Sequence, residues 1–262
     1  MTLGFSVDEL LPKARGGGQL RMGLTKLSED EWLQPEPDLA AREAAYFDFM
    51  DGVGFKGGDP QANREVAQIV GSGDILRDAA LSHHEDMCLL ERSPEDGIYR
   101  LTGVAVFWPT DWSPRAKLGL PLRALHAPIA GYEEQLATPV DTFMAILKPG
   151  PIFGRCNWFI APTGAMHWVQ GVSAEEDFAH VTPDNAGETL FVRSERQTLR
   201  KLPQTGAILF TIGVYVSPLG QLTRANQAML ADAIENLVAG EGDRRGTPAY
   251  GEALLRYHER NA

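Results

Sequence analysis

The chain has 262 residues, with 24 lysine and arginine residues against 35 aspartate and glutamate residues, so its formal net charge is −11. This acidic balance argues against nucleic acid as a partner, because phosphate binding requires clustered cations. No run approaches the ~18 consecutive apolar residues of a membrane span. The N-terminus lacks the basic start and apolar stretch of a signal peptide, so we expect a cytoplasmic protein without a membrane partner.

The first part of the chain contains two glycine-rich stretches. "RGGGQ" at 15–19 is typical of a flexible joint, so we expect a flexible segment over 1–19 and a single domain over 20–262. "GVGFKG" at 52–57 has the glycine spacing of a dinucleotide-binding loop. Because no helix start follows it, we interpret this stretch as an ordinary loop.

Residue patterns predict both helices and strands along the chain. Helix-forming runs predict helices over 37–50, 63–82 (interrupted at Gly71 and Gly73), 133–150, 219–240 and 248–260. Strand-like runs occupy 84–92, 97–108, 153–162, 188–203 and 205–217. Strands that lie close in sequence, with helices between and after them, indicate an antiparallel α+β domain.

Several common sites are not supported. His83 and His84 would face opposite sides of a strand, so we interpret them as a solvated strand entry rather than a metal site. Cys88 and Cys156 have no paired-ligand spacing and are expected to be free thiols. The chain has neither a Gly-x-Ser-x-Gly elbow nor a phosphate-binding glycine loop, so hydrolase and nucleotidase functions have little support.

The stretch "WSPRAKLGLPLRALHAPIAGY" places a histidine between prolines. Ser113 is a good N-cap and Gly119 a good stop for a first short helix. If a second turn follows, Leu122, Leu125 and His126 share one face and point inward. An inward imidazole can be a hydrogen-bonded core residue, a general base or an axial ligand to a flat apolar cofactor. Spacing alone slightly favours the first.

The strand candidate "GRCNWFIAP" alternates between two kinds of side chain. One face carries Arg155, Asn157 and Phe159, and the other carries Cys156, Trp158 and Ile160. A half-buried strand with a polar outer face and a functional strand are equally compatible with this pattern.

Cations concentrate in "RSERQTLRKLPQTGAILFTI". Arg193, Arg196, Arg200 and Lys201 fall within nine residues, with Glu195 among them. A solvated charged face is the usual interpretation of such a run. Here the run leads into an apolar strand, and arginines at the rim of an apolar pocket suit carboxylates. Together with an inward histidine, they fit a haem with two propionates.

These stretches together resemble the haem-dependent oxidative N-demethylase alpha-subunit family, which includes dimethylamine monooxygenase haem subunits. The resemblance rests on "EDMCLL", "YRLTGVAVFWPTDWSPRAKLG", "LHAPIAGY", "RCNWFI" and "RSERQTLRKLPQTGAILFTI", in that order, and covers about residues 20–255.

The resemblance implies a PAS-like α+β fold whose antiparallel sheet and flanking helices enclose haem b. It implies O2-dependent removal of a methyl group from a small secondary alkylamine as formaldehyde. The electrons come from NAD(P)H through a separate reductase subunit that carries FMN and a [2Fe–2S] cluster. Two cysteines cannot supply the four thiolates of a ferredoxin-type cluster, so this interpretation requires a partner.

The resemblance also suggests roles for individual residues. The histidine of its "L-H-x-P" motif falls on His126, the candidate axial iron ligand. Its other matched positions give candidates for cofactor binding at Lys117, Arg155, Asn157, Trp158, Arg193 and Arg200. Glu195 and Arg196 are the candidate catalytic residues. Cys156 as a thiolate ligand is a weaker alternative, since no cysteine-ligand motif surrounds it.

One departure from the family pattern stands next to the histidine. The usual "H-x-P-V-P-G" is here "HAPIAGY", with Ala130 in place of the second proline, while His126 and Gly131 are retained. Two other functions remain open at this stage. One is a haem-binding PAS-type gas or redox sensor without turnover, and the other is a structural relative without haem.

Overall fold

The computed structural model describes residues 3–14, 20–35, 37–48, 58–237 and 239–261. The two glycine-rich stretches at 15–19 and 52–57 lie outside the described residues, and with them the predicted joint and loop. Within the described ranges, no helix is both long and apolar enough to cross a membrane.

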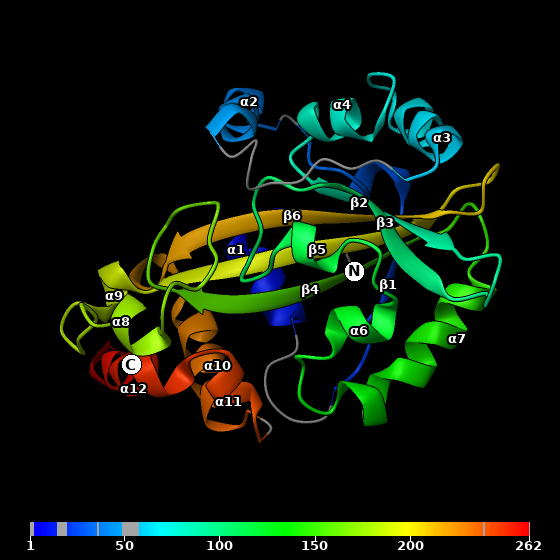
Figure 1. Cartoon of the computed structure of the whole chain (residues 1–262). Helices are drawn as coiled ribbons and strands as arrows, with labels where there is room; N and C mark the ends of the chain where they lie inside the picture. Colours follow the sequence, from blue (N-terminus) through cyan, green and yellow to red (C-terminus); the bar gives the residue numbers. More distant parts are fainter. Residues whose placement is uncertain (1–2, 15–19, 36, 49–57, 238, 262) are drawn as a thin grey trace.

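A six-stranded antiparallel sheet runs through the molecule (Figure 1), with the strand order β1-β4-β5-β6-β2-β3. The strands are β1 (Thr25–Leu27), β2 (Asp86–Arg92), β3 (Tyr99–Ala105), β4 (Ile152–Ala161), β5 (Phe191–Lys201) and β6 (Ile208–Pro218). The predicted antiparallel α+β class and all five predicted strands are confirmed. The sequence missed β1, because a strand of three residues is too short to show an alternating pattern.

Helices surround the sheet. The α-helices are α1 (Val7–Leu10), α2 (Leu39–Asp48), α3 (Pro60–Val70), α4 (Leu76–Leu81), α5 (Pro114–Lys117), α6 (Leu122–His126), α7 (Thr138–Ile146), α8 (Ala174–Asp177), α9 (Ala186–Thr189), α10 (Arg224–Glu235), α11 (Glu241–Arg244) and α12 (Thr247–Asn261). The predicted interruption at Gly71 is confirmed, since this residue ends α3 in the left-handed region at φ 77°. In Figure 1, α2, α3 and α4 lie together on one side of the sheet, and α10, α11 and α12 lie together near the C-terminus.

Part of the predicted flexible N-terminal segment belongs to the core. The apolar side chains of Leu3, Val7, Leu10 and Leu11 are all buried. The short helix α1 packs against β5 and β6. These apolar residues recur at helical spacing, which indicates a short buried helix. The glycine-rich stretch that follows them was given more weight, and it led to the expectation of a flexible segment. Residues 3–14 therefore differ from the expected loose attachment.

The local structure before His126 follows its sequence signals. The Oγ of Ser113 accepts a hydrogen bond from the N–H of Ala116 at 3.3 Å and caps α5. Gly119 takes a positive φ of 86° just after this helix. Leu122 and Leu125 of α6 are both buried. The predicted pair of short turns is thus confirmed.

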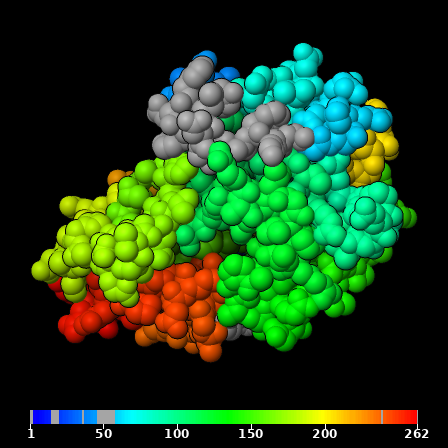
Figure 2. Space-filling view, in the orientation of Figure 1, coloured from blue at the N-terminus to red at the C-terminus, as the bar shows by residue number. Residues whose placement is uncertain are grey.

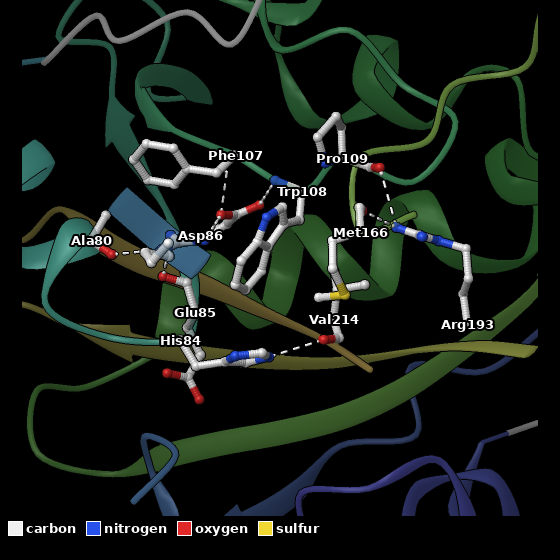
Figure 3. A network of polar contacts seen from close by, with 11 residues as sticks. Ala80, His84, Glu85, Asp86, Phe107, Trp108, Pro109, Met166, Arg193 and Val214 are labelled. Carbon is white, nitrogen blue, oxygen red and sulfur yellow. Dashed lines mark hydrogen bonds and ion pairs between the residues drawn. The ribbon is translucent and has the colours of Figure 1, made fainter. Parts of the chain in front are cut away.

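The buried carboxylate of Asp86 attaches the segment that begins at Phe107 to the sheet (Figure 3). Asp86 on β2 accepts hydrogen bonds from Arg42 Nη1 at 2.6 Å and from the N–H groups of Phe107 and Trp108 at 3.0 Å each. The same guanidinium donates to the carbonyls of Ala80 and Glu85. The charge pair is tolerated in the interior because its hydrogen-bonding groups are satisfied.

His84 lies within this buried network. It is only 9% exposed, and its Nε2 donates to the carbonyl of Val214 at 2.9 Å. Its ring lies 5.0 Å from that of Trp108 and 4.9 Å from that of Tyr215, measured between centroids. The predicted solvated strand entry is wrong for this histidine, because a backbone acceptor on β6 and two aromatic rings replace water.

We expect Asp86→Ala to lower the free energy of unfolding by about 3–5 kcal/mol, because it leaves Arg42 buried without its carboxylate. Urea unfolding monitored by circular dichroism measures this difference. Glu252→Ala is the matched control, since Glu252 is 75% exposed and also pairs with an arginine, Arg256. This substitution should cost less than about 1 kcal/mol. Equal losses in the two variants would contradict the assignment.

Candidate functional site

A cavity of about 430 Å³ lies between the sheet, the α5–α7 segment and α11. Small-molecule and cofactor sites have cavities of about 300–1,000 Å³ with mostly apolar walls. The space-filling view shows a recess where the segment around 160–180, the α5–α6 segment and the C-terminal helices meet (Figure 2). Apolar side chains line much of it, including Leu24, Leu90, Leu101, Phe143, Met144 and Phe210.

One face of β4 forms a wall of the cavity. Arg155, Asn157 and Phe159 line it, as the alternating pattern predicted. The intervening residues are buried on the opposite face of the sheet. Trp158, a sequence-based candidate for cofactor binding, is one of these and does not line the cavity.

His126 reaches the cavity from the last residue of α6. Its Nδ1 lies 2.8 Å from the carbonyl oxygen of Leu122. Since a carbonyl only accepts hydrogen bonds, Nδ1 carries the hydrogen. The imidazole stacks on Tyr132, with 4.6 Å between ring centroids and 15° between planes. Burial lowers the pKa of His126 to about 4, although its bond to Leu122 opposes this effect.

These constraints fix the chemical state of the imidazole. The ring is neutral at physiological pH, and Nδ1–H is committed to Leu122. The lone pair on Nε2 is therefore available, which is the tautomer of a histidine that binds a metal through Nε2. No group of three or more His, Cys, Asp or Glu side chains suited to a metal ion occurs among the described residues. A haem needs only an axial ligand from the protein.

Cationic side chains that line the same cavity include Lys117, Arg155 and Arg244. Lys117 Nζ donates to the carbonyl of Leu125 at 3.1 Å and lies 5.5 Å from the ring of Trp112. Burial lowers the pKa of Lys117, and the charge of Glu195 opposes this effect. An ammonium has three donors, so Lys117 retains capacity to bind a carboxylate of a ligand.

Glu195 places a carboxyl group in the cavity wall and is 5% exposed. Gln197 Nε2 donates to its Oε2 at 2.8 Å, and Thr110 forms a second side-chain hydrogen bond. Arg193 donates to Thr110 Oγ1 at 3.2 Å, so the hydroxyl hydrogen of Thr110 is left for Glu195. Burial raises the pKa of Glu195, while the hydrogen bond from Thr110 opposes this effect.

Arg193 does not line the cavity. Its Nη1 donates to the carbonyl of Ala165 at 2.6 Å. Its Nη2 donates to that of Met166 at 2.7 Å (Figure 3). The side chain is completely buried. Arg193 therefore holds the loop that contains Ala165 and Met166 against β5. It contributes to the cavity only indirectly, by donating a hydrogen bond to Thr110.

Arg196 and Arg200 lie on the face of β5 that is turned away from the cavity. Arg196 donates to the carbonyls of Glu31 and Trp32 and lies over the ring of Phe5. Arg200 forms a two-pronged ion pair with Glu29 at 2.7 and 2.8 Å. The sequence predicted a catalytic role for Arg196 and a cofactor-binding role for Arg200. The structure instead directs both side chains away from the cavity, because they alternate with Glu195 along the strand.

Both cysteines are buried free thiols, as predicted. Cys156 lies on the opposite face of β4 from the cavity, and burial raises the pKa of its thiol to about 11. Cys88 lines the cavity, but burial also raises the pKa of its thiol. Since the thiolate is the metal-binding form, neither residue is poised as a ligand.

The sequence analysis missed several residues of the cavity wall. Asp111, Glu241, Arg244 and Arg245 all line it. Asp111 has a φ of 53°, a positive value that is uncommon outside glycine and clusters at functional sites. Its place in the "WPTDW" stretch was the available signal. The α11 residues gave none, because only tertiary packing brings that helix to the sheet.

A family model described as haem-dependent oxidative N-demethylase, alpha subunit-like matches residues 59–255. The chain belongs to this family. The match contains His126 and every cation and carboxylate of the cavity wall described above. The family description implies a haem-dependent oxidative demethylase, and "alpha subunit" implies a protein that works with other subunits.

The depressed pKa of His126 makes a prediction about pH. The unfolded chain binds a proton near the ordinary value of 6.5, and the folded chain binds it only near 4. The stabilisation is complete above pH 6.5 and is lost as the pH falls toward 4, by up to about 1.4 kcal/mol per unit.

Urea unfolding of the haem-free protein at pH 6.5 and 4.5 tests this. His126→Gln should lose less stability than the wild type over this interval. His180→Gln, at an exposed histidine, should behave like the wild type. An unchanged pH dependence in His126→Gln would show that the imidazole does not carry the effect.

Proposed function

We propose that this chain is the haem-carrying subunit of a cytoplasmic monooxygenase that removes a methyl group from a small secondary alkylamine, such as dimethylamine. The observation that carries the proposal is a neutral His126 whose Nε2 lone pair is available in a largely apolar cavity. The family match supports haem as the group that this histidine holds. Bound haem b supplies the redox chemistry by which O2 is activated.

The residues of the cavity fit such a group. His126 would hold the iron of such a group through Nε2, because its Nδ1–H donates to the carbonyl of Leu122 and so sets the tautomer. The apolar wall accommodates the ring system. In this proposal Lys117, Arg155 and Arg244, which line the cavity, take the place of the cluster on β5 in binding two carboxylates. The proposal also includes a PAS-like fold, in which the sheet encloses the cofactor.

Glu195 binds the substrate in this proposal. Aliphatic amines are protonated at neutral pH, as the lysine side chain is. The donors Thr110 and Gln197 hold the carboxyl group in the cavity wall, where it accepts a hydrogen bond from the ammonium and takes up its proton. Asp111, on the same wall, adds negative charge.

The overall reaction balances with two electrons. Hydroxylation of the N-methyl carbon consumes O2, two electrons and two protons, and it yields water and a carbinolamine. The carbon–nitrogen bond of the carbinolamine then breaks to give formaldehyde and the demethylated amine. The electrons come from NAD(P)H through a separate reductase subunit with FMN and a [2Fe–2S] cluster. Cys88 and Cys156 are the only two thiols of this chain, and a cluster takes four.

Haem reconstitution tests the proposal. The purified protein should take up haem and show a Soret band, and His126→Ala should change that spectrum. His180→Ala, at an exposed histidine, is the matched control and should leave the spectrum unchanged. Absence of a Soret band in the wild type would contradict haem binding and favour a structural relative without haem. A spectrum indifferent to His126→Ala would contradict the ligand assignment.

Turnover separates an enzyme from a sensor. With a flavin and iron–sulfur reductase, NADH and dimethylamine, the haem-loaded protein should release one formaldehyde for each NADH oxidised. Haem binding without formaldehyde from any small secondary amine would favour a PAS-type gas or redox sensor.

We expect Glu195→Gln to raise the KM for dimethylamine about 10- to 100-fold while the haem spectrum stays unchanged. This range corresponds to the loss of one hydrogen bond to a charged group. Steady-state formaldehyde release measures it. Glu188→Gln is the control, because Glu188 is exposed and does not line the cavity. An unchanged KM in Glu195→Gln would remove Glu195 from substrate binding.

A further inference from the structure

The C-terminal helix α11 contributes a buried carboxylate to the cavity wall. The Glu241 side chain is 4% exposed. It accepts hydrogen bonds from Arg244 at 2.8 Å for both Nε and Nη2, and from Arg245 Nε at 3.2 Å. Three donors from two guanidinium groups therefore hold this carboxylate in one orientation.

Arg245 fixes the carboxylate relative to the sheet. Its Nη1 donates to the carbonyl of Trp158 on β4 at 2.6 Å. Its guanidinium lies 4.8 Å from the ring centroid of Trp158 and 4.9 Å from that of Phe159. Through Arg245, Glu241 is thus attached to the strand that carries Arg155 and Asn157 of the cavity wall.

Glu241 also contacts the segment that carries His126. Its Oε1 accepts the backbone N–H of Ala130 at 3.1 Å. A Cβ on Gly240 would lie only 3.3 Å from the Cβ of Ala130, so a glycine at 240 allows this close approach. Tyr132, two residues beyond Ala130, stacks on the imidazole of His126.

Two polar contacts therefore flank the histidine along the chain. Before it, Lys117 Nζ binds the carbonyl of Leu125 at 3.1 Å. After it, Glu241 binds the N–H of Ala130. The second contact needs a backbone N–H, which proline lacks. Alanine at position 130 supplies that N–H.

We propose that Glu241 is a positioning residue that latches residues 126–132 to the sheet through the N–H of Ala130, and so holds the imidazole of His126 in place. The haem-related part of this inference rests on the proposed function. The latch itself is a property of the haem-free protein and is testable without any cofactor.

Ala130→Pro removes the donor and leaves every side chain of the latch in place. Ala130→Ser keeps the N–H and is the matched control. In the haem-free protein, hydrogen–deuterium exchange over 126–132 should be about tenfold faster in Ala130→Pro than in Ala130→Ser, which corresponds to the loss of one hydrogen bond to a charged group. Exchange in β4–β6 should be equal in both.

Haem provides a second readout. After reconstitution, Ala130→Pro should transfer haem to apomyoglobin about tenfold faster than Ala130→Ser, because outer contacts of a metal-bound histidine change affinity about 10- to 100-fold. Its ferric electron paramagnetic resonance spectrum should also shift, because the same contacts orient the imidazole ring. Gly240→Ala provides a second variant, should Ala130→Pro fail to fold. An alanine at 240 would place its Cβ 3.3 Å from that of Ala130 and would be strained at the φ of 86°, so it should weaken the contact between the two segments and accelerate exchange over 126–132.

The outcomes distinguish the latch from the proposed function. Equal exchange over 126–132 in Ala130→Pro and Ala130→Ser would overturn the latch, whatever the spectra show. Faster exchange in Ala130→Pro together with no haem uptake by the wild type would support the latch and contradict the proposed function. Faster exchange with unchanged haem release and spectrum would overturn the positioning of His126.

Discussion

The polar wall of the cavity depends on one buried carboxylate that lies behind it. Asp86 holds Arg42 and the N–H groups of Phe107 and Trp108 with its two oxygens. The segment that begins there continues through Thr110 to Lys117, so the position of Asp86 on β2 sets where these side chains enter the cavity. A buried charge costs free energy unless all of its hydrogen-bonding partners are present, so the loss of any one partner of Asp86 would destabilise this contact.

Local periodicity predicted the part of the site that lies on a single strand or a single turn. The period of two along β4 correctly placed Arg155 and Asn157 on one face, and the helical spacing of α6 correctly turned His126 inward with its leucines. The same reasoning produced the antiparallel sheet. In each case the information is contained in a few consecutive residues, because the backbone geometry alone decides which side chains share a face.

Contacts between distant segments decided what the sequence could not. The cations of β5 are dense in sequence, but alternation sends Arg196 and Arg200 to the covered face, where Glu29 and the carbonyl groups of residues 31 and 32 bind them. No pattern within β5 indicates that those partners will be there. The carboxylate and guanidinium groups of α11 were overlooked for the converse reason, since they reach the cavity only after the C-terminal helices pack.

The position of α11 near the C-terminal end of the described residues has a consequence for how the cavity forms during synthesis. The cavity wall combines residues 20–24, strands from the middle of the chain and α11 at Glu241–Arg244. During synthesis from the N-terminus, His126 is therefore translated long before the last wall of its cavity exists. The complete cavity therefore forms only after about residue 245 has left the ribosome, and the proposed binding of a cofactor would follow that step.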